Sequence, residues 1–160
     1  MKKMAIRSLI LLLFLSLACS KPKDGNIPNS PTISELLNSP SSIVLGNNVL
    51  NLEGYFYRDF MPPTQPNGSP LIAICRVIDS SGAALNDSIE LTKFYMIYQN
   101  QLWKSDYTDL RWIEPNGIEG VARNGPKWGP DVFVDVVCEF RSKGTLYRLL
   151  AKEQEIEATY

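Results

Sequence analysis

The chain has 160 residues, nearly equal numbers of basic and acidic residues (16 and 17), and no histidine. The missing histidine excludes the usual Ser-His-Asp and Cys-His catalytic groups and the usual histidine-bearing zinc sites. The charge balance provides no basic surface for nucleic acid, and the length predicts one domain with its own core.

The first eighteen residues have the pattern of a secretion signal. Lys2, Lys3 and Arg7 form a basic start, and an apolar run from Leu9 to Leu17 follows. This run is about half of the roughly 20 apolar residues that a membrane-spanning helix needs. A basic start, a short apolar middle and a small residue at the end are typical of a signal peptide. We therefore expect residues 1–18 to be removed.

The segment Leu15-Ser16-Leu17-Ala18-Cys19 resembles the lipobox of bacterial lipoproteins, although the favoured lipobox has Leu in place of Ser16. In that family the cysteine thiol receives diacylglycerol, the signal is cut before it, and the new amino group receives a fatty acid such as palmitate. The resemblance implies a lipid anchor at Cys19 in the bacterial cell envelope. Ser20 resembles the residue type that directs lipoproteins to the outer membrane, and orientation toward periplasm or exterior stays open. The alternative is an ordinary signal peptide followed by a chance cysteine.

A linker follows the cysteine. The stretch SKPKDGNIPNSP, residues 20–31, has three prolines, one glycine and a single large apolar residue, Ile27. Such a segment cannot bury enough apolar surface to offset the entropy of ordering it. We expect residues 19–31 to be a lipidated cysteine with a flexible linker, and residues 32–160 to be the folded domain.

Strands are predicted for most of the folded domain. Thr32 to Leu37 is the exception, because it has the pattern of a capping box with one helical turn. Val49 to Phe60 is a predicted strand with Gly54 as a bulge or close-approach point. Leu71 to Ile78 is apolar on both faces except at Arg76, which indicates a central strand.

The stretch Ile89 to Trp103 allows two structures. Asp87 and Glu90 have the spacing of a helix cap, whereas the β-branched and aromatic residues that follow favour extended chain. We favour a strand, a turn at Gln99-Asn100 and a second strand, with a helix as the alternative.

The clearest alternation lies near the C-terminus. Val132 to Phe140 places apolar residues on one face in period two. Ser142-Lys143-Gly144 then turns the chain, and Leu146 to Lys152 returns as the second strand of a hairpin. Asp109 to Ile113 and Ile118 to Ala122 are predicted shorter strands.

About seven short strands joined by loops rich in glycine, proline and asparagine predict an all-β fold. Their arrangement resembles the antiparallel, immunoglobulin-like β-sandwiches that are common on secreted bacterial proteins. A likeness of fold carries no function with it.

Two further cysteines lie in predicted strands. Cys75 and Cys138 should both face the core, and their separation is similar to that of the sheet-bridging cysteines in immunoglobulin domains. The resemblance implies a disulfide, although Ile89 and Val136 stand where that family has a core tryptophan and a tyrosine. Two buried free thiols that act as small apolar residues are the alternative.

One loop, residues 122–131, carries the main candidate binding residues. Trp128 lies between two Gly-Pro pairs, and Arg123 and Lys127 are close in sequence. An aromatic side chain on a stiff loop suits the recognition of a sugar or a protein. The alternative is that Trp128 folds back and plugs the open end of the sandwich.

A second candidate is the long loop from Arg58 to Pro70, in which Phe60 and Met61 lie close to prolines. Long loops of compact domains are often functional. We expect the other two tryptophans, Trp103 and Trp112, to belong to the core.

No metal, cofactor or nucleic acid is predicted. Asp106 and Asp109, in the sequence DYTD, form a loose calcium candidate, but they lack the oxygen density of a calcium loop and a solvated turn is the stronger interpretation.

These expectations describe a lipid-anchored binding or accessory module of the bacterial envelope, held at the membrane by its lipid, and not an enzyme. Its expected partner is an envelope protein or a glycan. The alternative is a structural subunit docked permanently in an envelope complex. A small hydrolase that uses two carboxylates is a third hypothesis.

Overall fold

The computed structural model describes residues 30–63, 66–85 and 89–160, so the predicted signal peptide, Cys19 and nearly all of the linker lie outside the described residues. Residues Pro31–Tyr160 form one compact unit. The described part of this unit contains one short helix and nine strands: α1 (Ile33–Leu37), β1 (Ser42–Leu45), β2 (Asn48–Asp59), β3 (Leu71–Asp79), β4 (Ile89–Tyr98), β5 (Gln101–Ser105), β6 (Asp109–Ile113), β7 (Gly117–Gly125), β8 (Val132–Ser142) and β9 (Thr145–Thr159).

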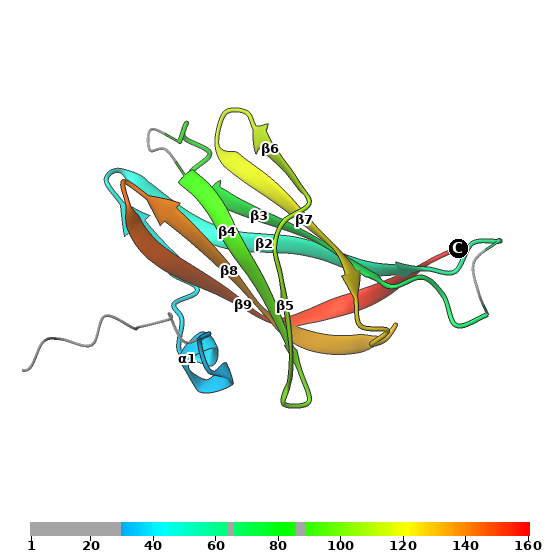
Figure 1. The fold of residues 1–160 in the computed structure, drawn as a ribbon. Helices are drawn as coiled ribbons and strands as arrows, with labels where there is room; N and C mark the ends of the chain where they lie inside the picture. Colours follow the sequence, from blue (N-terminus) through cyan, green and yellow to red (C-terminus); the bar gives the residue numbers. More distant parts are fainter. Residues whose placement is uncertain (1–29, 64–65, 86–88) are drawn as a thin grey trace, which may run out of the picture. The chain divides into compact units, whose positions relative to one another are not determined.

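The strands form one sheet, in the order β5-β4-β8-β9-β2-β3-β7-β6, with β1 paired to β2 (Figure 1). β2 and β9 are parallel, with Phe56 opposite Ile156 and Asp59 opposite Thr159. The other pairs of described strands are antiparallel. The prediction of an all-β fold is confirmed. The antiparallel immunoglobulin-like sandwich of about seven strands is not, because the strands form a single curled, mixed sheet.

This difference has a physical reason. Period-two alternation shows which face of a strand is buried, but it does not show which strand lies beside it. The twisted strands curl until β4, near one edge, contacts β7, near the other. The inner face therefore encloses the core by itself. Its buried residues include Leu50, Phe56, Leu71, Ala73, Cys75, Val77, Phe94, Met96, Ala122, Val136, Cys138, Phe140, Leu149 and Ile156.

Two glycines of β7 leave space for aromatic rings inside the curled sheet. A Cβ atom at Gly120 would lie 2.5 Å from the ring of Tyr107, and one at Gly125 would lie 2.7 Å from the ring of Trp103. Trp103 also packs edge-on against Phe94, with 5.0 Å between ring centroids. Trp103 thus packs against the core, as predicted.

The ambiguous stretch Ile89 to Trp103 is a hairpin, so the strand prediction is confirmed and the helix alternative is wrong. Gln99 and Asn100 have φ angles of 45° and 64°. Two successive positive φ angles are characteristic of the tight turn that fits the twist of paired strands, and asparagine tolerates this conformation well.

The predicted C-terminal hairpin is also confirmed. Lys143 and Gly144, with φ angles of 49° and 81°, form the turn between β8 and β9. The returning strand continues beyond the predicted end at Lys152 to Thr159.

The central position of β3 agrees with its sequence, because it pairs with β2 on one side and β7 on the other. Cys75 is fully buried, whereas Arg76 points to the opposite, outer face. Gly54 on β2 is a close-approach point, since a Cβ atom there would lie 2.1 Å from the ring of Phe56.

The predicted capping box starts α1. Thr32 Oγ1 accepts a hydrogen bond from the Glu35 amide at 3.2 Å, and the Glu35 carboxylate accepts one from the Thr32 amide at 2.7 Å. Leu36 is fully buried against the outer face of β4, β8 and β9. Its neighbours there are Tyr95, Ile97, Val137 and Leu150. Within the described residues no helix has the length and apolar character needed to cross a membrane.

Candidate binding site

The two loops predicted to bind a ligand meet at Arg58. This side chain is only 2% exposed. Its guanidinium donates hydrogen bonds to the carbonyl oxygens of Ser69 (3.0 Å), Gly129 (2.6 Å), Lys127 (3.3 Å) and Asn67. Arg58 therefore fixes both loops from the inside and is not available to a ligand.

The predicted residues of the first loop differ in exposure. Phe60 lies over the guanidinium of Arg58 at 5.0 Å and beside the ring of Tyr160 at 5.9 Å. Met61 is exposed. Of this predicted pair, Met61 is therefore the more accessible side chain.

Trp128 packs inward. Its ring lies 5.6 Å from the ring of Tyr98, and it packs against the inner core. Arg123 instead pairs with Asp109 at 3.3 Å on the outer face. The side chain of Lys127 is exposed. The structure gives no joint site of Trp128 and Arg123, and the packing of Trp128 agrees with the alternative in which it closes one end of the fold.

Cys75 and Cys138 are both buried free thiols in the structure. The hydroxyl of Tyr107 donates a hydrogen bond to Cys138 Sγ at 3.0 Å. Burial raises the pKa of Cys138 to about 12 and the pKa of Cys75 well above its usual value. Thiols in this state are inert as nucleophiles.

The calcium candidate is an ordinary polar turn with its acids already paired. Asp106 pairs with Lys93, and Asp109 pairs with Arg123. Among the described residues no three histidine, cysteine or acidic side chains gather as metal ligands would.

Trp112 departs from the sequence expectation, because it is 52% exposed and does not belong to the core. It lies on β6, an edge strand that pairs only with β7. An edge strand has one neighbouring strand to cover its side chains, and the alternation along Asp109 to Ile113 gives no sign of that position. The charged residues Asp109 and Arg111 in a strand of only five residues are the signal that sequence reasoning could have used, because short charged strands are typical of sheet edges.

The outer face around β6 carries a concentration of arginines. We call it the arginine face, and helix α1, which lies over β4, β8 and β9, does not cover it. Its residues are Glu53 and Tyr55 on β2, Ile74, Arg76 and Ile78 on β3, Glu119, Val121 and Arg123 on β7, and Asp109, Arg111 and Ile113 on β6.

One row across this face alternates in charge. The strand register sets Glu53 opposite Arg76, Arg76 opposite Glu119, and Glu119 opposite Arg111. Arg76 Nε lies 2.7 Å from one oxygen of Glu119, and Arg111 Nε lies 2.6 Å from the other. Opposite charges at directly opposed positions stabilise paired strands.

Glu119 is ionised despite its burial. Burial by itself would raise the pKa of this carboxyl group, but the hydrogen bonds and positive charges of Arg76 and Arg111 outweigh it and lower the pKa below its usual value. Glu119 as a whole residue is only 3% exposed, so its role is to hold the two arginines in place.

Two open cavities adjoin this row, and Arg111 borders both. One, of about 510 Å³, is lined by Arg76, Arg111, Trp112, Glu53, Asn116 and two isoleucines. The other, of about 330 Å³, is lined by residues that include Arg111, Arg123, Ile74 and Leu110. These volumes are in the range of small-ligand sites.

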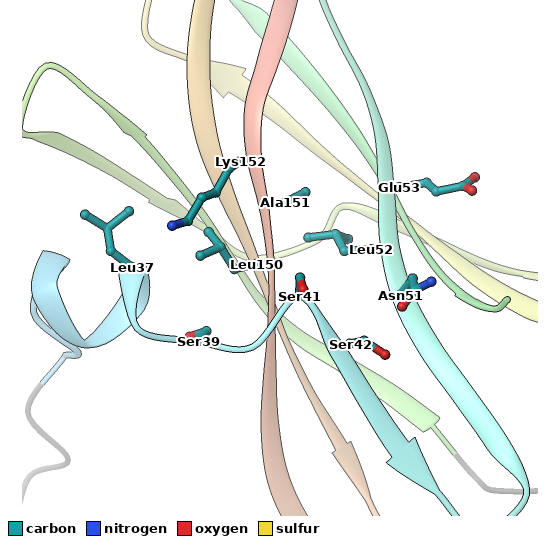
Figure 2. A pocket seen from close by; sticks show the side chains of 10 residues that line it. All are labelled: Leu37, Ser39, Ser41, Ser42, Asn51, Leu52, Glu53, Leu150, Ala151 and Lys152. Atoms are coloured by element: carbon teal, nitrogen blue, oxygen red, sulfur yellow. The ribbon is translucent and has the colours of Figure 1, made fainter.

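A further cavity, of about 690 Å³, lies where β2 and β9 separate (Figure 2). Leu52 and Ala151 lie between the two strands, and serines of the segment that enters β1 form one wall. Glu53 and Lys152 point to opposite sides in Figure 2, so their charges do not converge on this cavity. The candidate site is therefore placed at the arginine face.

Comparison with known proteins adds no relative: no family model, curated protein or solved structure matches this chain.

Proposed function

We propose that Pro31–Tyr160 is a non-catalytic binding module, tethered to a bacterial envelope membrane by lipid on Cys19, that recognises a glycan through the arginine face. The lipobox-like segment supports the tether. The observation that carries the binding role is a single open cavity bordered by an exposed tryptophan and two arginines, Trp112, Arg76 and Arg111.

The chemistry of this face suits a sugar. Sugars present hydroxyl groups, which planar polar side chains bind, and apolar C–H faces, which lie against aromatic rings. Arginine, glutamate and asparagine side chains line the cavity beside Trp112. Tyr55 and Tyr57 add a stacked pair on β2, with 5.1 Å between their rings.

A structural subunit is the second candidate. Ile72 and Ile74 lie opposite Tyr57 and Tyr55 on the outer side of β3 and are only partly buried. Partly exposed aliphatic and aromatic side chains of this kind could contact a permanent protein partner. Co-purification of a stoichiometric partner through a high-salt wash would favour this candidate over glycan recognition.

The test is binding of the full chain, solubilised in detergent, to an array of bacterial envelope glycans. We expect wild-type protein to bind and Trp112→Ala to lose about tenfold in affinity. Phe133→Ala is the matched control, because Phe133 is also an exposed aromatic residue (62%) but lies on β8. If the wild-type protein binds no glycan, or if both variants lose affinity equally, the proposed function is wrong.

A further inference from the structure

Two guanidinium groups on the arginine face converge on one buried carboxylate. Each uses its Nε to contact a different oxygen of Glu119. A guanidinium carries five N–H donors, and among the described residues neither Arg76 nor Arg111 has a polar partner other than Glu119. The Nη donors of both arginines therefore remain available.

These donors face water, whereas the charge that balances them is buried. The side chains of Arg76 and Arg111 are 43% and 69% exposed, and the side chain of Glu119 is 4% exposed. Arg76, Arg111 and Glu119 together carry one net positive charge, and Glu53, opposite Arg76 in the same row, balances it. The part of this three-residue group that a ligand can reach consists of arginine N–H groups.

Two other acids lie near this group. Asp109 is already paired with Arg123. Glu53 lines the same cavity as Arg76 and Arg111 but makes no ion pair with a described residue. Glu53 therefore offsets the charge of Arg76 in part and repels an anion in the cavity. It leaves the Nη donors of both arginines unoccupied, and it can accept a hydrogen bond from a hydroxyl group.

We propose that the recognised glycan is acidic, and that a sugar carboxylate is held between the Nη groups of Arg76 and Arg111. This inference rests on the proposed function and specifies its ligand as a uronic-acid polysaccharide. A planar carboxylate accepts two hydrogen bonds from guanidinium groups in a fixed geometry, which is why arginine is favoured at such sites. Trp112 borders the cavity from the edge strand. It lies opposite the inner-face residue Ile118, so its ring contacts the apolar face of a sugar that extends around the edge of the sheet.

Glu119 is the positioning residue of this site. Its two oxygens contact the Nε atoms of Arg76 and Arg111. These contacts fix the orientation of both guanidinium groups and so the direction of their remaining N–H donors. A site whose donors are held in place before the ligand arrives loses less entropy on binding. The ion pairs thus act on the ligand through the arginines, and Glu119 itself does not touch the sugar.

The probes are three uronic-acid trisaccharides, made of galacturonate, glucuronate or mannuronate, each paired with its neutral methyl ester. Affinities are measured by calorimetry on the detergent-solubilised full chain. We expect at least one acid to bind about tenfold more tightly than its ester, with affinity that falls as salt rises. Tighter binding of every ester than of its acid, or equal binding, would overturn the inference.

Three variants locate the carboxylate. Arg111→Gln should weaken binding of the acid about fivefold and leave the ester unaffected. Glu53→Gln should strengthen binding of the acid, because it removes a like charge. Arg141→Gln is the control, since Arg141 is an exposed arginine on β8, and it should change neither affinity. If Arg111→Gln binds the acid with unchanged affinity, the proposed position of the carboxylate is wrong.

The two proposals fail in different ways. If acids and esters bind equally and Trp112→Ala weakens both, the glycan-binding function stands and the acidic ligand is wrong. If neither acids nor esters bind and the envelope glycan array is also negative, the proposed function itself is wrong.

Discussion

Arg58, near the end of β2, donates a hydrogen bond to the carbonyl oxygen of Gly129 at 2.6 Å, and this bond joins two residues that are 71 positions apart in the sequence. The same guanidinium also donates hydrogen bonds to the carbonyl oxygens of Ser69 and Asn67, in the loop between β2 and β3. Burial lowers the pKa of Arg58 from its usual value, but arginine remains protonated in proteins, so its hydrogen bonds to these carbonyl oxygens are charge-assisted. Arg58 is thus the structural centre of the end of the sheet that carries both loops.

We predict that Arg58→Ala lowers the free energy of unfolding by about 3 kcal/mol, because four carbonyl oxygens lose their donor in a buried site. Arg58→Lys should recover only part of this loss, since an ammonium group cannot reproduce the planar fork. Chemical denaturation measures both, and Arg141→Ala is the exposed control, expected within about 0.5 kcal/mol of wild type. Equal stability of Arg58→Ala and wild type would show that the loops are fixed by other contacts.

Cys75 and Cys138 should behave as inaccessible free thiols. Both are fully buried, and burial raises the pKa of each. We expect an alkylating reagent, without reductant, to leave both unmodified in native protein and to modify both after denaturation. Peptide mass mapping reads the two sites separately from Cys19. Two unmodified cysteines after denaturation, joined in one cross-linked peptide, would instead show a disulfide.

The Glu119 ion pairs should make stability depend on pH in acid. Because folding lowers the pKa of Glu119, the stability that its charge contributes is fully present above the pKa of the unfolded chain. It is lost as pH falls through the lower pKa of the folded state. We expect the difference in unfolding free energy between wild type and Glu119→Gln to be largest near neutral pH and to shrink below about pH 4.

Denaturation curves at several pH values test this prediction. Comparing the two proteins at each pH cancels the contribution of Asp79, whose pKa is also lowered, mainly by a hydrogen bond from Ser81. A difference that stays constant from about pH 7 to about pH 3 would mean that the ion pairs do not contribute to stability.

The proposed tether predicts a clear change in fractionation. Cys19→Ala should move the protein from the membrane fraction to the supernatant, because each acyl methylene buried in the bilayer contributes about 0.8 kcal/mol and the variant has no acyl chain. Cys75→Ala is the control and should remain with the membranes. A Cys19→Ala protein that stays in the membrane fraction after a high-salt wash would rule out a lipid anchor at this position.

Local signals explain the part of the fold that the sequence predicts. Alternation identified the strand around Val132, and a run that is apolar on both faces except at Arg76 identified the strand from Leu71. The period of two then placed Cys75 inward and Arg76 outward. Asn100 marked the turn of a hairpin that could also have been a helix. Each of these features depends on residues a few positions apart, which is the range over which sequence patterns carry information.

The failures concern contacts between distant segments. The parallel pairing of Phe56 with Ile156 joins the beginning of the domain to its end, and no local pattern indicates it. Arg58 was predicted to begin a long loop, whereas it lies in β2 and its side chain is buried. Trp112 was predicted to belong to the core, whereas its strand lies at the edge of the sheet.

Hydrogen–deuterium exchange of the detergent-solubilised full chain, with and without purified envelope polysaccharide, tests most directly whether the arginine face binds a glycan. β6 and β5 are the edge strands at the two ends of the main strand order, and of these two only β6 belongs to this face. We predict slower exchange in β6 and in its neighbour β7 when the polysaccharide is present, with β5 unchanged. Slower exchange at β5 alone, or no change in either edge strand, would contradict the proposed site.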